Sequence, residues 1–222
     1  MPTHTIRIWD LPTRLFHWLL AASVVALVVT AKVGGNAMVW HFRLGYVVLA
    51  LLAFRLVWGL VGGRWSRFAS FVPTPARLLN YLRGNPRPQD KAGHNPLGAL
   101  SVLALLGVTA AQVSSGLFTD DEIAFSGPLT RFVSGEVVSQ FTTYHKEVGQ
   151  YLLLGLVALH LLAIVFYALV RKERIVRPMV QGDKQLPEAV PPSLDSLATR
   201  ALAIALAGAC AALAWWVSSL GG

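Results

Sequence analysis

Four of the six histidines lie within or at the ends of long apolar segments: His17, His41, His145 and His160. Ionisable side chains are rare in such segments and often mark a functional site. Neutral imidazole is a common metal ligand, so the chemistry that these residues predict is the binding of a metal or of a metal-containing cofactor. Any one of them is equally well explained as a hydrogen-bond partner between helices, so the inference depends on the whole set.

The four histidines are predicted to lie at two depths in a membrane. His17 and His160 fall near the inner face, and His41 and His145 near the outer face, as assigned below from the charges of the loops. At a rise of about 1.5 Å per residue, His160 lies roughly 22 Å from His145 along one helix. Fifteen steps of about 100° leave these two residues within roughly 60° of one helix face. The pattern therefore predicts two imidazoles at each depth.

Two imidazoles at each depth favour haem over zinc. A structural zinc site needs about four converging ligands, whereas haem iron takes only axial ligands from the protein, because the porphyrin supplies the other four. We therefore predict two haem b groups, one between His41 and His145 and one between His17 and His160. The sequence has no CxxCH motif and only one cysteine, Cys210, which excludes covalent c-type attachment and an internal disulfide.

Glycines and arginines near the histidines fit a flat, anionic cofactor. Gly45 and Gly149 each follow a histidine by four residues, where a side chain on the same helix face would collide with the macrocycle. Arg14, Arg43 and Arg55 lie close enough to the histidines to pair with haem propionates. For Arg55, snorkelling of the side chain to the inner surface is the alternative.

Long apolar helices must position these residues. The chain of 222 residues is 55% hydrophobic and only 14% charged, which predicts an all-α integral membrane protein. A membrane-spanning helix needs about 20 apolar residues. Five stretches meet this length, and their runs are continuous rather than alternating, which favours helices over barrel strands: 14–33, 41–61, 96–116, 146–170 and 199–219.

The charges of the loops predict the orientation. Segment 62–95 holds six basic residues and one acidic residue, whereas segment 117–144 holds one basic and four acidic residues. The basic segment is expected on the cytoplasmic side of the membrane, with the N-terminus in the cytoplasm and the C-terminus on the outer side. Topology and contact with anionic membrane lipid explain the net charge of +8 without a nucleic-acid partner.

Three connecting segments also carry structural predictions. Thr74 and Pro75 are typical of the cap and first residue of a short helix that ends at Gly84 and lies on the inner membrane surface. Segment 137–144 predicts a similar helical segment in the outer loop, and 185–195 predicts a flexible connector. The expected organisation is a cytochrome-like membrane domain over 1–177, a cytoplasmic linker over 178–198 and an additional transmembrane helix over 199–222.

Several motifs together resemble the bacterial cytochrome b561 family, which includes the b-type cytochrome subunits of nickel-iron hydrogenases. They are WDLPTRLFHWLL, HFRLGY, FRLVWGLVGG, GHNPLGAL and GLFTDDEIAFSGPL, and the likeness covers residues 6 to 177. The resemblance implies a four-helix di-haem bundle that passes electrons between membrane quinone and a partner. The fifth helix lies outside the shared region, and the spacing of fifteen residues from His145 to His160 differs from the fourteen expected in some members.

The leading functional prediction is electron transfer between the quinone pool and an external redox protein, such as a cytochrome c or a hydrogenase, docked on segment 117–144. A second interpretation is a superoxide-oxidising quinone reductase, in which Arg43 and Lys146 steer the anion. A third is a non-redox membrane transporter with histidine relays. That interpretation leaves the pairing of the histidines at two depths and the adjacent glycines unexplained.

Overall fold

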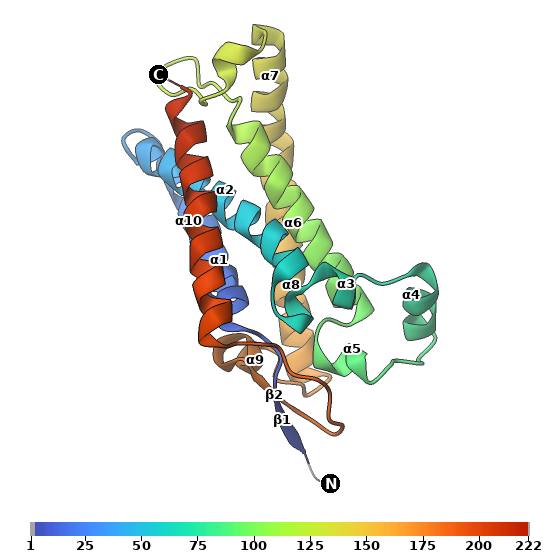
Figure 1. Cartoon of the computed structure of the whole chain (residues 1–222). Helices are drawn as coiled ribbons and strands as arrows, with labels where there is room; N and C mark the ends of the chain where they lie inside the picture. Colours follow the sequence, from blue (N-terminus) through green and yellow to red (C-terminus); the bar gives the residue numbers. More distant parts are fainter. Residues whose placement is uncertain (1–2, 222) are drawn as a thin grey trace. The chain divides into compact units, whose positions relative to one another are not determined.

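The computed structural model describes residues 3–221, and Figure 1 shows that helices dominate it. Among these residues, five helices are long and apolar enough to cross a membrane, which confirms an all-α integral membrane protein with five predicted spans. In chain order they are α1 (Leu11–Val33), α2 (Ala37–Val61), α6 (Pro96–Gly116), the continuous helical run Gly135–Leu169 that ends in α8 (Gln150–Leu169), and α10 (Leu197–Ser219).

The chain divides into two compact units, and each of the five long helices contributes residues to both. Unit 1 comprises Met1–Phe16, Arg55–Ala104 and Ala158–Ile204, and unit 2 comprises His17–Phe54, Leu105–Val157 and Ala205–Gly222.

Unit 1 contains a small sheet that the sequence did not predict. Strand β1 (His4–Arg7) pairs antiparallel with β2 (Asp183–Leu186), with His4 opposite Leu186. Their inward side chains join a buried apolar cluster that includes Ile8, Trp9 and Trp65. The prediction of a flexible connector over 185–195 is therefore wrong, because this segment begins within a paired strand. The proposed domain boundaries at 177 and 198 stay a prediction.

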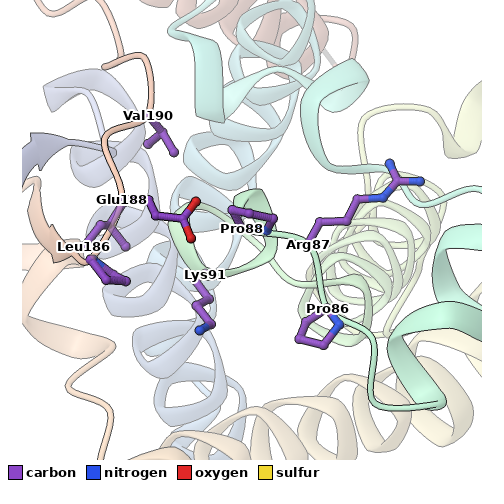
Figure 2. A pocket seen from close by; sticks show the side chains of 8 residues that line it. Pro86, Arg87, Pro88, Lys91, Leu186, Glu188 and Val190 are labelled. Atoms are coloured by element: carbon purple, nitrogen blue, oxygen red, sulfur yellow. The ribbon is translucent and has the colours of Figure 1, made fainter.

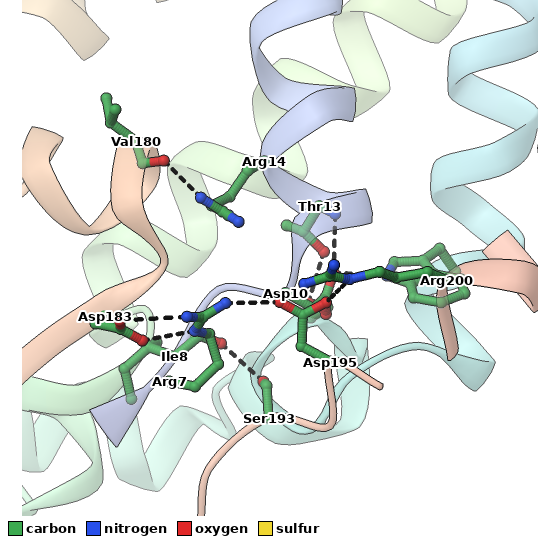
Figure 3. Close-up of polar contacts among 12 residues, drawn as sticks. Arg7, Ile8, Asp10, Thr13, Arg14, Val180, Asp183, Ser193, Asp195 and Arg200 are labelled. Atoms are coloured by element: carbon green, nitrogen blue, oxygen red, sulfur yellow. Dashed lines mark hydrogen bonds and ion pairs between the residues drawn. The ribbon is translucent and has the colours of Figure 1, made fainter. Parts of the chain in front are cut away.

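Polar contacts hold the rest of the connector (Figure 3). The Ser193 hydroxyl donates to the Ile8 carbonyl at 2.7 Å. Arg7 donates to Asp183 at 2.5 Å and to Asp195 at 2.7 Å, and Asp195 also accepts from Arg200 at 2.9 Å. Burial acts to raise the pKa of Asp195, but the hydrogen bonds from Arg200, the Leu11 amide and Arg7 outweigh it and lower this pKa.

A buried carboxylate caps α1 in unit 1. Asp10 is fully buried, and its Oδ1 accepts from the Thr13 amide at 2.8 Å and from the Trp58 indole at 3.2 Å. Its Oδ2 accepts from the Ser66 hydroxyl at 2.6 Å. The carboxylate thus joins the start of α1 to α2 and to the short helix that follows α2. A side chain at Gly63 would collide with Asp10 Oδ2.

The short helices of unit 1 follow their local sequence signals. Helix α4 (Pro75–Leu82) has Thr74 as its N-cap, whose hydroxyl accepts from the Arg77 amide, and Pro75 as its first residue, as predicted. Gly84 follows this helix at a φ of +83°. The other short helical segments of this unit are η1 (Arg64–Ser66), α3 (Phe68–Phe71), α5 (Gln89–Ala92) and α9 (Val176–Gln181).

A shallow hollow of about 150 Å³ also lies in unit 1, where the segment before α6 approaches β2 and the residues after it (Figure 2). Its lining includes Arg87, Lys91 and Glu188 together with three prolines.

Unit 2 also contains a tight turn and several short helices. Gly34 and Gly35 have φ values of +67° and +52°, a conformation that favours glycine, and they end α1 as predicted. The loop 117–144 contains η2 (Thr130–Phe132) and α7 (Gly135–Thr143), and α7 overlaps the predicted helical segment 137–144. Helix α7 leads directly into η3 (Tyr144–Gly149), a π-helix that continues into α8.

Candidate functional site

Unit 2 brings together two of the predicted ligands. His41 comes from the first turns of α2, and His145 comes from η3. Their ring centroids lie 6.2 Å apart, and the ring planes are almost perpendicular, at 86°. Two imidazoles that are 104 residues apart in the sequence therefore lie next to each other in the structure.

The hydrogen bonds of the two rings determine which nitrogen can bind a metal. His41 Nδ1 lies 3.0 Å from the Leu27 carbonyl oxygen, and His145 Nδ1 lies 2.9 Å from the Gln112 carbonyl oxygen. A carbonyl only accepts, so in each neutral ring Nδ1 carries the hydrogen. The Nε2 lone pair of each ring is then available for a ligand bond. A second-shell hydrogen bond of this kind is typical of metal-binding histidines.

The separation of the rings fits two axial ligands of one metal. A metal–imidazole bond is about 2 Å long, so two such bonds on opposite sides of one ion place the nitrogens about 4 Å apart. Adding slightly more than about 1 Å from each nitrogen to its ring centre gives roughly 6 Å between centroids. The observed 6.2 Å agrees with this value.

A cavity of about 490 Å³ adjoins the two histidines within unit 2. This volume is within the usual range of cofactor and ligand sites, about 300 to 1,000 Å³. Most of the lining is apolar or aromatic, and Phe42 stacks against Phe125 at a centroid distance of 5.9 Å. The charged lining residues are two cations and two anions: Lys32, Lys146, Asp120 and Asp121.

Glycines leave room beside the histidines, although not all as predicted. A Cβ atom at Gly45 would meet no atom within 4 Å, and Gly45 lines the cavity, as a flat cofactor requires. A Cβ atom at Gly149 would instead collide with the Gln112 side chain, so helix packing accounts for this glycine, and its contact with a macrocycle stays a prediction. Gly116, which sequence reasoning missed, lies against the His145 ring: a Cβ atom there would be 2.9 Å from Cε1.

Of the cations predicted near the outer histidines, Lys146 lines this cavity and Arg43 does not, so pairing of Arg43 with a propionate stays a prediction. Arg43 is exposed, and its guanidinium lies 5.0 Å from the centre of the Trp40 ring, outside the cavity lining. Lys32 and Lys146 line the cavity instead. Lys32 lies in the last turn of α1. Only the tertiary structure, in which the chain turns back at Gly34, shows that Lys32 belongs to this site.

In unit 1, two predicted arginines have buried nitrogens without a hydrogen-bond partner among the described residues. Arg55 is only 4% exposed, and its guanidinium lies 4.7 Å from the centre of the Phe68 ring. Its Nη1 has no partner, and neither does the Nε of Arg14, whose Nη1 donates to the Val180 carbonyl at 2.5 Å. The burial of Arg55 does not agree with snorkelling to the surface. An unpartnered buried N–H group fits an anionic ligand that completes the site.

The other two predicted ligands, His17 and His160, are half-buried. His17 lies in the part of α1 that belongs to unit 2, and His160 lies in the part of α8 that belongs to unit 1. Their pairing therefore stays a prediction.

Comparison with known proteins identifies the family. The family model described as prokaryotic cytochrome b561 matches residues 8–182, well over half of the chain. The chain belongs to this family. It is accordingly a multi-pass membrane b-type cytochrome that binds haem b and takes part in electron transfer.

The similar proteins include b-type cytochrome subunits of hydrogenases. The chain is 26% identical to the probable Ni/Fe-hydrogenase B-type cytochrome subunit of Azotobacter vinelandii, over 80% of this chain and 87% of the relative. It is 23% identical to the subunit of that name from Bradyrhizobium diazoefficiens, over 82% and 86%. The probable Ni/Fe-hydrogenase 1 B-type cytochrome subunit of Escherichia coli K12 is 25% identical over 49% of this chain and 57% of the relative. No solved structure matches the chain.

The π-helix accounts for the spacing between the predicted ligands His145 and His160 in this b561 chain. A π turn pairs residue i with i+5 rather than i+4, so it takes up one residue more than an α turn. His145 is the second residue of η3, and η3 continues directly into α8. The fifteen residues from His145 to His160 therefore cover the arc that fourteen α-helical residues would cover, within about 40° of four full turns.

Proposed function

We propose that the chain binds two b-type haems and transfers electrons across the bacterial inner membrane between the quinone pool and an external redox partner. The observation that carries this proposal is the pair of Nδ1 hydrogen bonds to the carbonyls of Leu27 and Gln112. They orient two imidazoles 6.2 Å apart and leave both Nε2 atoms as ligands.

The outer haem would be held by residues of unit 2. His41 and His145 would supply the axial ligands, and Gly45 and Gly116 would leave space for the flat ring. Lys32 and Lys146, rather than Arg43, would pair with carboxylates of the cofactor. When bound, the haem supplies one-electron chemistry, and the apolar cavity limits water around it.

The inner haem would use His17 and His160 as its axial ligands. The unpartnered nitrogens of Arg14 and Arg55 support propionate pairing at this site. Because Arg55 is surrounded by the aromatic rings of Phe16, Phe68 and Phe71, an anionic partner would also offset the cost of burying its charge.

The distribution of charge supports the proposed orientation. Unit 1 contains fifteen of the nineteen basic residues and six of the eleven acidic residues, whereas unit 2 contains four basic and five acidic residues. All the strongly basic loops belong to unit 1, and we place them on the cytoplasmic side. The loop 117–144, in unit 2, then faces the periplasm.

The names of the similar proteins favour a hydrogenase-like partner over a cytochrome c, because the relatives described above are hydrogenase cytochrome subunits. The partner would dock on the loop 117–144, since Asp120, Asp121 and Phe125 of this loop line the cavity at the outer haem. Quinone would exchange electrons with the inner haem.

A second candidate function is the oxidation of superoxide with reduction of quinone. The cavity lining supplies two cations, Lys32 and Lys146, that would attract an anion, and their charge is balanced by Asp120 and Asp121 in the same lining. Family membership favours either redox function over the transporter interpretation. Stopped-flow mixing with superoxide separates the two redox functions, since a carrier for a protein partner need not react with this anion near the diffusion limit.

Haem content tests the proposal directly. The full chain, purified from haem-replete cells, should contain about two haems per chain by pyridine haemochrome assay, both low-spin. His41→Ala should remove mainly the outer haem and His160→Ala mainly the inner one. A haem-free wild-type protein, or one haem retained with full occupancy in a His41→Ala, His160→Ala double variant, would refute it.

A further inference from the structure

The π-helix that carries His145 creates a local problem in backbone pairing. Where i→i+5 pairing returns to i→i+4 pairing, one carbonyl is skipped and loses its helical donor. A buried carbonyl without a donor costs free energy, so such groups are normally satisfied by side chains or water. Segment η3 returns to α-helical pairing at the start of α8.

Two glutamine side chains donate to carbonyls at this junction. Gln112 Nε2 of α6 donates to the His145 carbonyl at 3.0 Å. Gln150 Nε2 donates to the Lys146 carbonyl. Because η3 ends at Gly149, its last i→i+5 pair joins the Gln150 amide to the His145 carbonyl, and the skipped carbonyl is that of Lys146. Gln150 satisfies that carbonyl from its own helix. Gln112 instead crosses from α6 and ties the main chain of the π-helix to another element.

Gln112 also contacts His145 through its backbone. Its carbonyl accepts the His145 Nδ1–H at 2.9 Å and the Ser115 hydroxyl at 2.9 Å. Its side chain packs where Gly149 has no Cβ atom. One residue of α6 thus holds the main chain of His145 with its amide and the ring of His145 with its carbonyl.

We infer that Gln112 is a positioning residue for the outer haem, which ties the main chain of His145 to α6 and thereby fixes the direction of the His145 imidazole. This inference rests on the proposed role of His145 as an axial ligand. Without the amide, the main chain of His145 would lose its hydrogen bond to α6, which would let the imidazole turn away from His41. Outer-shell residues of this kind typically change metal affinity about 10- to 100-fold when they are replaced.

The test uses Gln112→Met, which preserves length and loses the amide. In the full chain we expect at least about a ten-fold loss of haem affinity at the outer site, together with a changed EPR signal of that haem and an unchanged inner haem. The matched control is Gln140→Met, at an exposed glutamine of α7, which should leave both haems as in the wild type.

The outcomes separate this inference from the proposed function. If Gln112→Met behaves like Gln140→Met, the positioning role is overturned and the haem site stands. If Gln112→Met fails to fold, Gln112 serves general packing and the inference is overturned. Full outer haem occupancy in His145→Ala would instead refute the proposed ligand set.

Discussion

The imidazole rings of His41 and His145 lie 6.2 Å apart and stand at 86° to each other. Each ring is held by a different carbonyl, that of Leu27 for His41 and that of Gln112 for His145. Because the two carbonyls belong to α1 and α6, the angle between the rings is a property of how the helices of unit 2 pack. This relationship leads to the first prediction.

The outer haem should give a strongly anisotropic low-spin ferric EPR spectrum. Each imidazole bound to the iron would interact through its π system with one of two iron d orbitals, and two perpendicular rings would leave these orbitals nearly equal in energy. We expect this signal in a His160→Ala variant, in which the outer haem is observed alone. A rhombic spectrum typical of parallel rings would contradict the geometry of the site.

A bulky residue at Gly45 should exclude the outer haem without unfolding the protein. A Cβ atom at Gly45 meets no atom within 4 Å. The Gly45→Phe side chain would therefore fill the cavity rather than collide with neighbouring residues. The expected result is loss of about one of two haems, with the unfolding temperature of the haem-free protein nearly unchanged.

Gly59 provides the contrasting variant. A Cβ atom there would collide with the Phe68 ring, so Gly59→Ala should lower stability by about 1 to 3 kcal/mol through overpacking. Thermal unfolding in detergent and haem absorbance together distinguish the two glycines. Equal stability losses for Gly45→Phe and Gly59→Ala would show that the cavity is not open at Gly45.

Removal of the Asp10 carboxylate should destabilise unit 1. Asp10→Ala leaves buried donors on Thr13, Trp58 and Ser66 without their acceptor. Each unsatisfied buried donor costs about 1 to 3 kcal/mol, and the total is less than additive, so we expect a loss of at least about 3 kcal/mol. Asp10→Asn keeps one acceptor oxygen and should lose less. Denaturant unfolding measures both, and an Asp10→Ala protein as stable as the wild type would contradict the assignment.

The attachment of β2 should be stable at neutral pH and weaken only in acid. The pKa of Asp195 is lowered in the folded protein, so its ion pairs stabilise the fold at every pH above the unfolded value, about 4. This stabilisation is lost as the pH falls through the lowered pKa. Hydrogen exchange at the amides of β1 and β2 should therefore stay protected from pH 7 down to about 4.

Asp195→Asn should remove this protection at neutral pH. Loss of the charged acceptor for Arg7 and Arg200 should cost about 2 kcal/mol, which corresponds to roughly thirty-fold faster exchange. Glu188→Gln, at an exposed acid in the same connector, is the matched control and should not change exchange. Equal effects of the two variants would show that the Asp195 network does not hold the sheet.

Much of the fold was predictable because its signals are local. Continuous apolar runs predict the five spanning helices, Gly34 and Gly35 predict the first turn, and Thr74 with Pro75 predicts the start of α4. The pairing of β1 with β2 was not predictable, because it joins residues about 180 positions apart in strands of only four residues. Such short strands have no periodicity strong enough to show in a sequence.

The site was only partly predictable for a related reason. His41 and His145 stand out because ionisable residues are rare in apolar helices. Lys32, Gly116 and Gln112 do not stand out, since their types are common and only packing brings them to the cavity or to the His145 ring. The π-helix at His145 could have been suspected from the spacing of fifteen residues, which was one longer than expected.

The sequence by itself determined that this is a helical membrane protein, where its spans lie, and which imidazoles were candidates, because hydropathy and residue type act along the chain. The tertiary structure alone decided which nitrogen of His41 and His145 is left for a metal and which residue holds His145 in place. The physical reason is that the tautomer of an imidazole is set by the hydrogen bond of its other nitrogen. Here that bond reaches a carbonyl on a neighbouring helix, and the helix positions that meet depend on packing.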